Sequence, residues 1–499
     1  MKSLLRWSCW MMFGLLLMGY DAAAEDKLPI PEREESWQAI FLSGQRVGYA
    51  RVLVDPREVD GKPVVHTSAE TKMEIRRFGQ VLKMTTALVS EETLAGDLLE
   101  FRFSMANPPA SSSETVGRVK GTELQLETTV DRKKKSSTSA WKEGVKSPTF
   151  QDRLLRISPL KSGETKSFEA FFPEFSKPGM LTVTAGATET VSLLDGKTAT
   201  LQKFKVANSL LPGIITNAWV DKTGQTIKSS TNMLGTEMAT YTVSKEEALK
   251  TLTVNDLDLG VSTLVKTAKI DRPYETKKVV YKITIRDDNP SKVLPTGDTQ
   301  SVKSTGAETA ELTVIALPIP TTSPPEKIGD EYLKPTRFLQ SDDERVIEHA
   351  RLAAGNLTDA AQMARAMEKY VREKLTNKNF STALASAGEV ARSLEGDCTE
   401  HAVLLAAMLR AKQIPSRIAV GLVYVESLQA FGGHMWTEAR LDGKWVPLDG
   451  TLGRGGIGAT HIKLADVLFA EDDSIAPLSS FAPLMTILGK LDVGVASVE

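Results

Sequence analysis

The sequence predicts a multidomain protein, with a β-rich N-terminal half followed by an α+β C-terminal part. The 499 residues exceed what one hydrophobic core usually organises, so we expect two to four domains. Up to about residue 249, apolar residues alternate in short runs rich in β-branched and aromatic side chains. Beyond residue 336 they first recur with helical spacing and then alternate again. Helices followed by strands predict separate helical and sheet layers.

The N-terminal residues have the composition of a targeting segment. Lys2 and Arg6 supply positive charge ahead of a short apolar run over residues 10–20, and residues 22–24 are three alanines that suit cleavage. We therefore expect residues 1–24 to be a signal peptide and the protein to be exported, periplasmic or extracellular. The alternative is an uncleaved N-terminal membrane anchor. No later apolar run approaches the ~20 residues of a membrane span, so none is expected after cleavage.

Residues 25–249 are predicted to form one β-rich domain, a large curved antiparallel sheet or partial barrel. Hairpin turns are expected at Asp60-Gly61 and Asp195-Gly196, since glycine accepts positive φ at little cost. A short helix is expected over Gln151–Ile157, and Lys133–Lys135 is expected to be a solvated turn. This domain carries no motif that indicates chemistry. The strand-like runs are residues 38–42, 47–54, 81–89, 99–105, 167–172, 180–184 and 203–206.

A smaller β domain is predicted for residues 250–317, because Lys278–Ile285 and Glu311–Leu317 both have strand composition. Residues 318–335 begin with four prolines in eight positions. Such a segment holds neither a helix nor a central strand, so we expect a linker.

Residues 336–475 are predicted to form the α+β domain, and residues 476–499 a C-terminal tail. Ser341 begins a capping-box pattern for a helix that ends at Gly355, and Thr358 and Ser386 are expected to cap the next two helices. The remaining elements are a helix over residues 398–412 and strands over 417–425, 434–441 and 445–448, with a turn at Asp442-Gly443.

The chain has two cysteines, and Cys9 lies in the targeting segment. Cys398 would then be the single thiol of an exported protein, so no intramolecular disulfide is expected. Cys398 opens a predicted helix, where free backbone N–H groups and the helix dipole favour a thiolate. A thiolate attacks acyl carbon, and the N–H of Cys398 is a candidate oxyanion donor. The alternative, a small buried apolar residue, is disfavoured by the polar neighbours of Cys398.

His434 and Asp449 are the candidate partners of Cys398. His434 is expected to begin a strand after Gly432-Gly433 and to accept the thiol proton, although a lone histidine is more often structural. Asp449 is expected at the end of the paired strand, where it would orient the imidazole or form an Asx turn. His401 is interpreted as a wall residue one helical turn from Cys398. His461, after a glycine-rich stretch, is less constrained.

The composition and motifs exclude several functional classes. The formal net charge is −2, which does not indicate a nucleic-acid partner. One cysteine with scattered histidines does not give the spacing of a closed zinc site. The segment Gly453–Gly458 lacks the Lys-Ser/Thr ending of a phosphate loop. We therefore expect no metal and no cofactor.

The segment Gly396–Ala402, together with Ile414–Arg417, His434–Glu438 and Trp445–Asp449, resembles bacterial transglutaminase-like proteins. The resemblance covers roughly residues 341–466. It implies a papain-like fold, a Cys398–His434–Asp449 triad and thiol acyl chemistry on a peptide or glutamine amide. This chain has Gly450 where the family commonly shows proline. It carries no EF-hand-like loop, so no calcium requirement is expected.

These observations favour an exported thiol enzyme that acts on a peptide or protein substrate. If water accepts the acyl group the enzyme is a peptidase or amidase, and if a lysine amine accepts it the enzyme is a transglutaminase. We slightly favour hydrolysis, since water is always present. The alternative from another class is a catalytically silent binding or scaffold protein.

Overall fold

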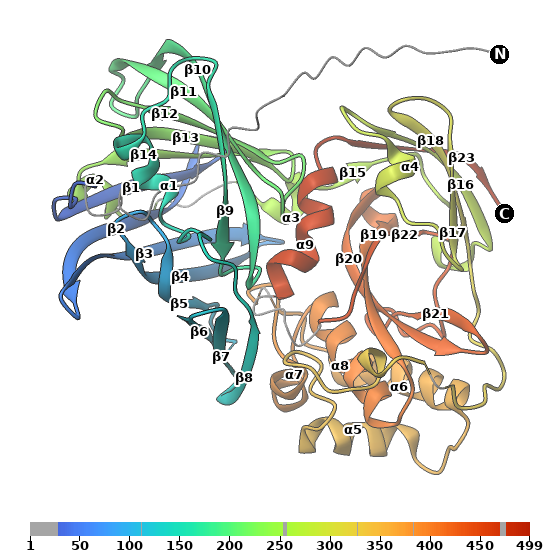
Figure 1. Ribbon diagram of the computed structural model, residues 1–499. Coiled ribbons are helices and arrows are strands. Elements are labelled where there is room, and N and C mark those ends of the chain that lie inside the picture. The colour runs from blue at the N-terminus through green and yellow to red at the C-terminus, as the bar shows by residue number, and fades with distance from the viewer. Residues whose placement is uncertain (1–27, 111, 253–256, 327, 383, 470–475) are drawn as a thin grey trace, which may run out of the picture.

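The computed structural model describes residues 28–110, 112–252, 257–326, 328–382, 384–469 and 476–499. The predicted signal peptide and Cys9 lie outside the described residues. The chain forms a large curved sheet followed by a second body of helices and two smaller sheets (Figure 1). This arrangement confirms the predicted fold class.

The N-terminal half is a single 14-stranded sheet in which every paired neighbour is antiparallel. The spatial order runs from β8 back to β1 and then from β14 back to β9, so the first strand lies beside the last. Isolated bridges join Lys146 to Asp97, just before β5, and to Ala170 of the end strand β9, which connects two distant parts of the curved sheet. The strands are β1 (Glu34–Leu42), β2 (Gln45–Val59), β3 (Lys62–Arg77), β4 (Gln80–Thr93), β5 (Leu98–Ala106), β6 (Ser113–Lys120), β7 (Glu123–Val130), β8 (Lys133–Ala140), β9 (Thr165–Phe172), β10 (Lys177–Ser192), β11 (Thr198–Asn208), β12 (Ile215–Val220), β13 (Thr226–Met233) and β14 (Thr236–Val243).

The interpretation of Lys133–Lys135 as a turn was wrong, because these residues begin strand β8. The preceding Asp131 and Arg132 make the turn, both with positive φ. All eight residues of β8 are exposed. Lysines on an exposed edge strand discourage pairing with another chain, which explains a charged run inside a strand.

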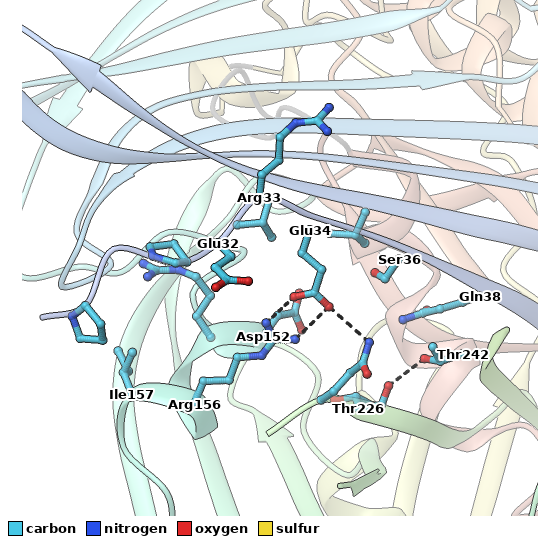
Figure 2. A pocket seen from close by; sticks show the side chains of 16 residues that line it. Glu32, Arg33, Glu34, Ser36, Gln38, Asp152, Arg156, Ile157, Thr226 and Thr242 are labelled. Atoms are coloured by element: carbon cyan, nitrogen blue, oxygen red, sulfur yellow. Dashed lines mark hydrogen bonds and ion pairs between the residues drawn. The ribbon is translucent and has the colours of Figure 1, made fainter. Parts of the chain in front are cut away.

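Helix α1 (Gln151–Ile157) lies where the sequence predicts it. Its Leu154 and the preceding Phe150 pack against β10 and β11, so one face of the helix shares a core with the sheet. A cavity of about 410 Å³ lies between α1 and strands β1, β2, β13 and β14 (Figure 2). Its charges are partly paired, since Arg156 donates to Glu34 at 2.5 and 3.2 Å and Gln225 donates to Glu34 at 3.3 Å. This cavity is lined only by residues of the β-rich half.

The C-terminal part contains a five-stranded and a four-stranded sheet. In the five-stranded sheet the order is β15-β20-β19-β22, with β21 paired to β20; in the four-stranded sheet it is β17-β18-β16-β23. The strands are β15 (Val265–Lys266), β16 (Lys278–Ile285), β17 (Gln300–Ser304), β18 (Thr309–Ile315), β19 (Ser416–Val425), β20 (Ala430–Leu441), β21 (Lys444–Leu448), β22 (His461–Val467) and β23 (Leu491–Val498). Helices α2 (Lys245–Ala248) and α3 (Leu259–Ser262) contact the large sheet. The helices that follow are α4 (Pro290–Val293), α5 (Glu344–Ala354), α6 (Ala360–Lys374), α7 (Ala387–Ser393), α8 (Cys398–Ala411) and α9 (Ala476–Ile487).

The helix starts differ slightly from prediction. Asp343, not Ser341, caps α5, and Asp359, not Thr358, caps α6. In each case the carboxylate accepts a free N–H of the first turn, which the residue immediately before the helix is best placed to do. Ser386 caps α7 through the full capping box with Glu389, as predicted.

Residues 476–499, expected to be a tail, contain α9 and β23, and β23 pairs with β16. One hydrophobic cluster runs through both smaller sheets and the helices, with Tyr281, Met367, Leu404 and Phe431 all buried in it. The small sheet and the helical layer therefore share a core, and the domain boundaries stay a prediction. No helix among the described residues is long and apolar enough to cross a membrane.

Candidate active site

Helix α8 presents Cys398 as its first residue. The N-cap Asp397 accepts hydrogen bonds from the N–H and hydroxyl of Thr399 at 2.8 and 2.9 Å, and Glu400 accepts the N–H of Asp397 at 3.0 Å. This capping box fixes the start of a helix whose next twelve residues are buried, while Cys398 itself is half-buried. The thiol thus stands at the exposed end of a rigid buried helix.

His434 reaches the site from the sheet. It lies on β20 opposite Gly421 of the central strand β19. The expectation that His434 begins its strand was wrong, because β20 starts at Ala430 and includes both preceding glycines. Pairing with β19 on one side and β15 on the other continues the strand through Phe431. His434 is therefore held inside a hydrogen-bonded strand rather than at a loop end.

Asp449 follows β21 and contacts His434 directly. Oδ2 of Asp449 accepts from Nε2 of His434 at 2.8 Å, and both residues are buried. Oδ1 of Asp449 accepts the backbone N–H groups of Thr451 and Leu452 at 2.8 and 3.2 Å. The carboxylate therefore makes the Asx turn and the contact to the imidazole at once. Because Nε2 is engaged by Asp449, Nδ1 is the ring nitrogen of His434 available to the thiol.

The charges of His434 and Asp449 shift each other's pKa. Burial would lower the pKa of His434, but the charge of Asp449 and, after it, that of Cys398 raise the pKa to about 10. The hydrogen bonds of His434 with Asp449 and with Cys398 add to this shift. Burial opposes the charge on Asp449 as well, yet His434 holds the pKa of Asp449 well below its usual value. The arrangement therefore favours a protonated His434 beside an ionised Asp449.

His461 is a contact of this group that the sequence interpretation missed. Its Nε2 lies 3.1 Å from the same Oδ2 of Asp449, and its side chain is fully buried. Burial lowers the pKa of His461, so the ring is neutral and donates through Nε2. His461 begins β22, which pairs with the opposite side of β19 from β20. No local pattern in the sequence reveals this pairing, because the two histidines meet only across the sheet.

The backbone of Asp449 is also held by a buried acid. Oε1 of Glu368, on α6, accepts the N–H of Asp449 at 2.8 Å and that of Gly456 at 3.0 Å. Burial raises the pKa of Glu368 to about 7. A Cβ at Gly450 would lie 3.0 Å from the side chain of Val371 on α6, so a larger residue here would need a small shift of that side chain.

Backbone carbonyl groups hold the ring of His401. Its Nδ1 lies 2.6 Å from the carbonyl oxygen of Asp397 and its Nε2 lies 3.1 Å from that of Leu375. Burial, followed by the charge of Lys378, lowers the pKa of His401 to about 4. The ring is therefore a neutral structural link between α8 and the end of α6.

The two histidines around Asp449 are also potential metal ligands. In the part of the chain that the structure describes, His434, Asp449 and His461 form the one group of three potential ligands, with their ligand atoms within 4.8 Å of one another. Each of these atoms is already used in the hydrogen bonds around Asp449. The geometry thus accounts for the three side chains as a hydrogen-bonded network.

Comparison with known proteins identifies part of the chain. Residues 349–450 match the family model of the transglutaminase-like superfamily. These residues form a transglutaminase-like domain. The match includes Cys398, His434 and Asp449, and it supports a thiol enzyme. Comparison with the curated proteins finds no significant match.

Three solved structures are similar to parts of the chain. One is described as a "Putative Cysteine Protease" from Cytophaga hutchinsonii, with 18% identity, covering 45% of this chain and 87% of that one, at a TM-score of 0.29. A β-barrel-like protein from Brucella abortus has 11% identity, coverage of 43% and 98%, and a TM-score of 0.30. A "Putative Protease" from Parabacteroides distasonis has 12% identity, coverage of 70% and 63%, and a TM-score of 0.19. TM-scores this low mean only loose spatial overlap.

Proposed function

We propose that the transglutaminase-like domain is a thiol hydrolase that cleaves amide bonds of peptides or proteins. The observation that carries the proposal is the buried His434–Asp449 pair, joined at 2.8 Å, with Cys398 as its third member at the start of α8. Cys398, His434 and Asp449 take the roles of nucleophile, proton carrier and orienting group.

The reaction follows from these positions. The Cys398 thiolate forms a bond to the amide carbonyl carbon, and the backbone N–H of Cys398 is placed to stabilise the resulting oxyanion. The C–N bond breaks, and the imidazolium of His434 gives its proton to the leaving amine. Water then attacks the thioester, with His434 accepting its proton. The C–S bond breaks, the acid is released, and the Cys398 thiolate beside the His434 imidazolium is restored.

Amine transfer uses the same acyl-enzyme and differs only in the acceptor. Mass spectrometry of a peptide library incubated with the protein, with and without an added primary amine, separates the outcomes. We expect either cleavage fragments whose masses sum to the peptide plus one water, or deamidation with a mass gain equal to water minus ammonia, whether or not the amine is present. Mass gains equal to the amine minus ammonia would instead identify a transglutaminase. An unchanged library under both conditions would favour the catalytically silent binding protein.

We also propose that the chain is exported, to the periplasm or beyond, after removal of residues 1–24. The alanines before Glu25 and the lone thiol of the remaining chain support this location. N-terminal sequencing of the protein recovered from the envelope or medium is expected to begin at Glu25. A chain that keeps Met1 and sediments with membranes would indicate the anchored alternative.

A further inference from the structure

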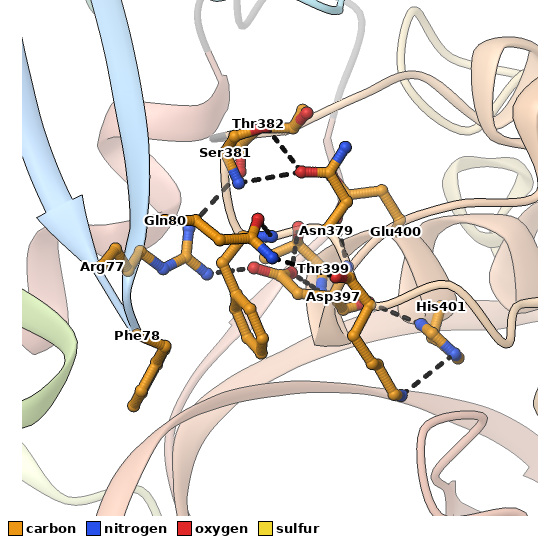
Figure 3. A network of polar contacts seen from close by, with 12 residues as sticks. Arg77, Phe78, Gln80, Asn379, Ser381, Thr382, Asp397, Thr399, Glu400 and His401 are labelled. Carbon is orange, nitrogen blue, oxygen red and sulfur yellow. Dashed lines mark hydrogen bonds and ion pairs between the residues drawn. The ribbon is translucent and has the colours of Figure 1, made fainter.

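The turn between β3 and β4 extends from the large sheet to the transglutaminase-like domain. Phe78 and Gly79 form this turn, both with positive φ, and their N–H groups donate to Asp258 at 2.8 and 2.7 Å. Figure 3 shows Arg77, at the end of β3, pointing from the sheet toward Asp397. The hairpin is thus held in one conformation and directed at the start of α8.

The hairpin tip is attached to the segment between α6 and α7. Gln80 donates to the carbonyl oxygen of Lys378 at 3.2 Å and accepts the N–H of Phe380 at 2.8 Å. The rings of Phe78 and Phe380 pack with their centroids 5.0 Å apart. Two hydrogen bonds from the Gln80 side chain to the backbone, and one aromatic pair, hold the hairpin tip in a defined position.

Arg77 makes the contact closest to the thiol. Its Nη2 pairs with Oδ2 of Asp397, whose side chain is completely buried, and its Nη1 donates to the carbonyl oxygen of Thr382 at 3.4 Å. Asp397 directly precedes Cys398, so an unpaired carboxylate there would oppose a thiolate. Burial works against the charge on Arg77, but Asp397, Cys398 and Glu400 together raise the pKa of the guanidinium. Arg77 is therefore a cation paired with the residue that directly precedes Cys398.

We propose that the β-rich half completes the active site of the transglutaminase-like domain by placing the guanidinium of Arg77 beside Cys398, where its charge stabilises the thiolate. The inference rests on the proposed function, because it takes Cys398 as the nucleophile. Arg77 is a positioning residue: it acts through the charge state of the thiol and touches neither substrate nor leaving group. It gives the β-rich half, which has no chemical motif of its own, a role in the chemistry.

The test is the pH dependence of Cys398 alkylation by iodoacetamide in the full chain, read by mass spectrometry of the peptide that contains Cys398. Iodoacetamide reacts with the thiolate form, so the labelling rate measures the fraction of Cys398 that is ionised, and no substrate is needed. Arg77→Gln leaves Asp397 charged, buried and unpaired, which threatens folding. The decisive comparison is therefore Asp397→Asn against Arg77→Gln/Asp397→Asn. Asparagine keeps the helix cap, and no unpaired carboxylate remains.

We expect Arg77→Gln to raise the midpoint of labelling by about one pH unit in the Asp397→Asn background, because a nearby opposite charge shifts a titration by about that much or more. Arg77→Lys keeps the charge, so its labelling midpoint should stay close to that of the chain with Arg77. Arg102→Gln is the matched control, since Arg102 makes an exposed ion pair with Glu114 within the large sheet. It should label as the wild-type chain does.

Two results would overturn the inference: coincident midpoints with and without Arg77, or a shift in Arg77→Lys as large as in Arg77→Gln. Failure of the proposed function has a different signature. If His434→Ala labels as the wild-type chain does at every pH, Cys398 and His434 do not form a reactive pair. If His434→Ala slows labelling at mildly acidic pH while Arg77→Gln changes nothing, the inference about Arg77 is wrong and the proposed function stands.

Discussion

Replacing Cys398 by alanine is expected to reduce peptide turnover to background, a loss of about 10⁴-fold or more in kcat/KM. No other thiol lies in the described residues, and the acyl-enzyme needs a sulfur at the start of α8. Stability should change little, since Cys398 is half-buried and alanine suits the first turn of a helix. Steady-state kinetics and thermal unfolding of the same preparation measure both effects.

Cys398→Ser tests whether the sulfur itself, rather than the shape of the side chain, is needed for turnover. Serine keeps the shape of the side chain but loses the thiolate, so we expect it to be nearly as inactive as alanine. Turnover retained in Cys398→Ala at the wild-type rate would rule out the covalent mechanism. A loss accompanied by a lower unfolding temperature would instead point to damage of α8.

Replacing Asp449 by asparagine is expected to lower turnover by about 10³-fold, less than the loss of the thiol. The Asx turn survives, because asparagine keeps an oxygen for the N–H groups of Thr451 and Leu452. The new amide N–H₂ group, however, faces the Nε2 atoms of His434 and His461, which both donate in the wild-type chain. His434 must then carry its proton on Nδ1, where it can no longer accept one from Cys398.

The same substitution has a pH signature in stability. The pKa of His434 is about 10 in the fold, above the ~6.5 of an unfolded chain, so its stabilisation is complete below pH ~6.5 and is lost as pH rises through about 10. The pKa of Asp449 is lowered, so its stabilisation is present above pH ~3.9 and is lost as pH falls further. Urea unfolding should show Asp449→Asn less stable than the wild-type chain by about 2–3 kcal/mol at pH 5.5. The difference should shrink by pH 10.

Asp442→Asn is the matched control for this experiment. Asp442 is exposed in the turn between β20 and β21, with a positive φ that asparagine tolerates well. It should match the wild-type chain in kinetics and in stability at both pH values. If Asp449→Asn also matched the wild-type chain, Asp449 would not orient the base.

Much of the secondary structure follows from local signals. The bounds of α1 and β16 coincide with their predicted ranges, and α8 begins at Cys398 because Asp397 and Glu400 form a capping box there. Capping and residue alternation involve only a few neighbouring positions, so they can be recognised directly in the sequence. The exact cap of α5 differs because Ser341 and Asp343 both suit that role, and tertiary packing chose between them.

The long-range contacts were not predictable in this way. His461 reaches Asp449 because β20 and β22 flank the same strand, and β23 completes a sheet begun some 200 residues earlier. Arg77 meets Asp397 across 320 positions of the chain. Pairing of distant segments depends on the summed packing of many residues, and no short motif encodes it.

By itself the sequence determined the division into a β-rich half and an α+β part, and the candidate residues Cys398, His434 and Asp449, because periodicity, caps and short motifs are local properties. Only the tertiary structure decided that a second histidine shares the carboxylate of Asp449 and that the large sheet brings a guanidinium to the start of α8. The physical reason is that electrostatic contacts act through space, and folding sets the distances that decide them.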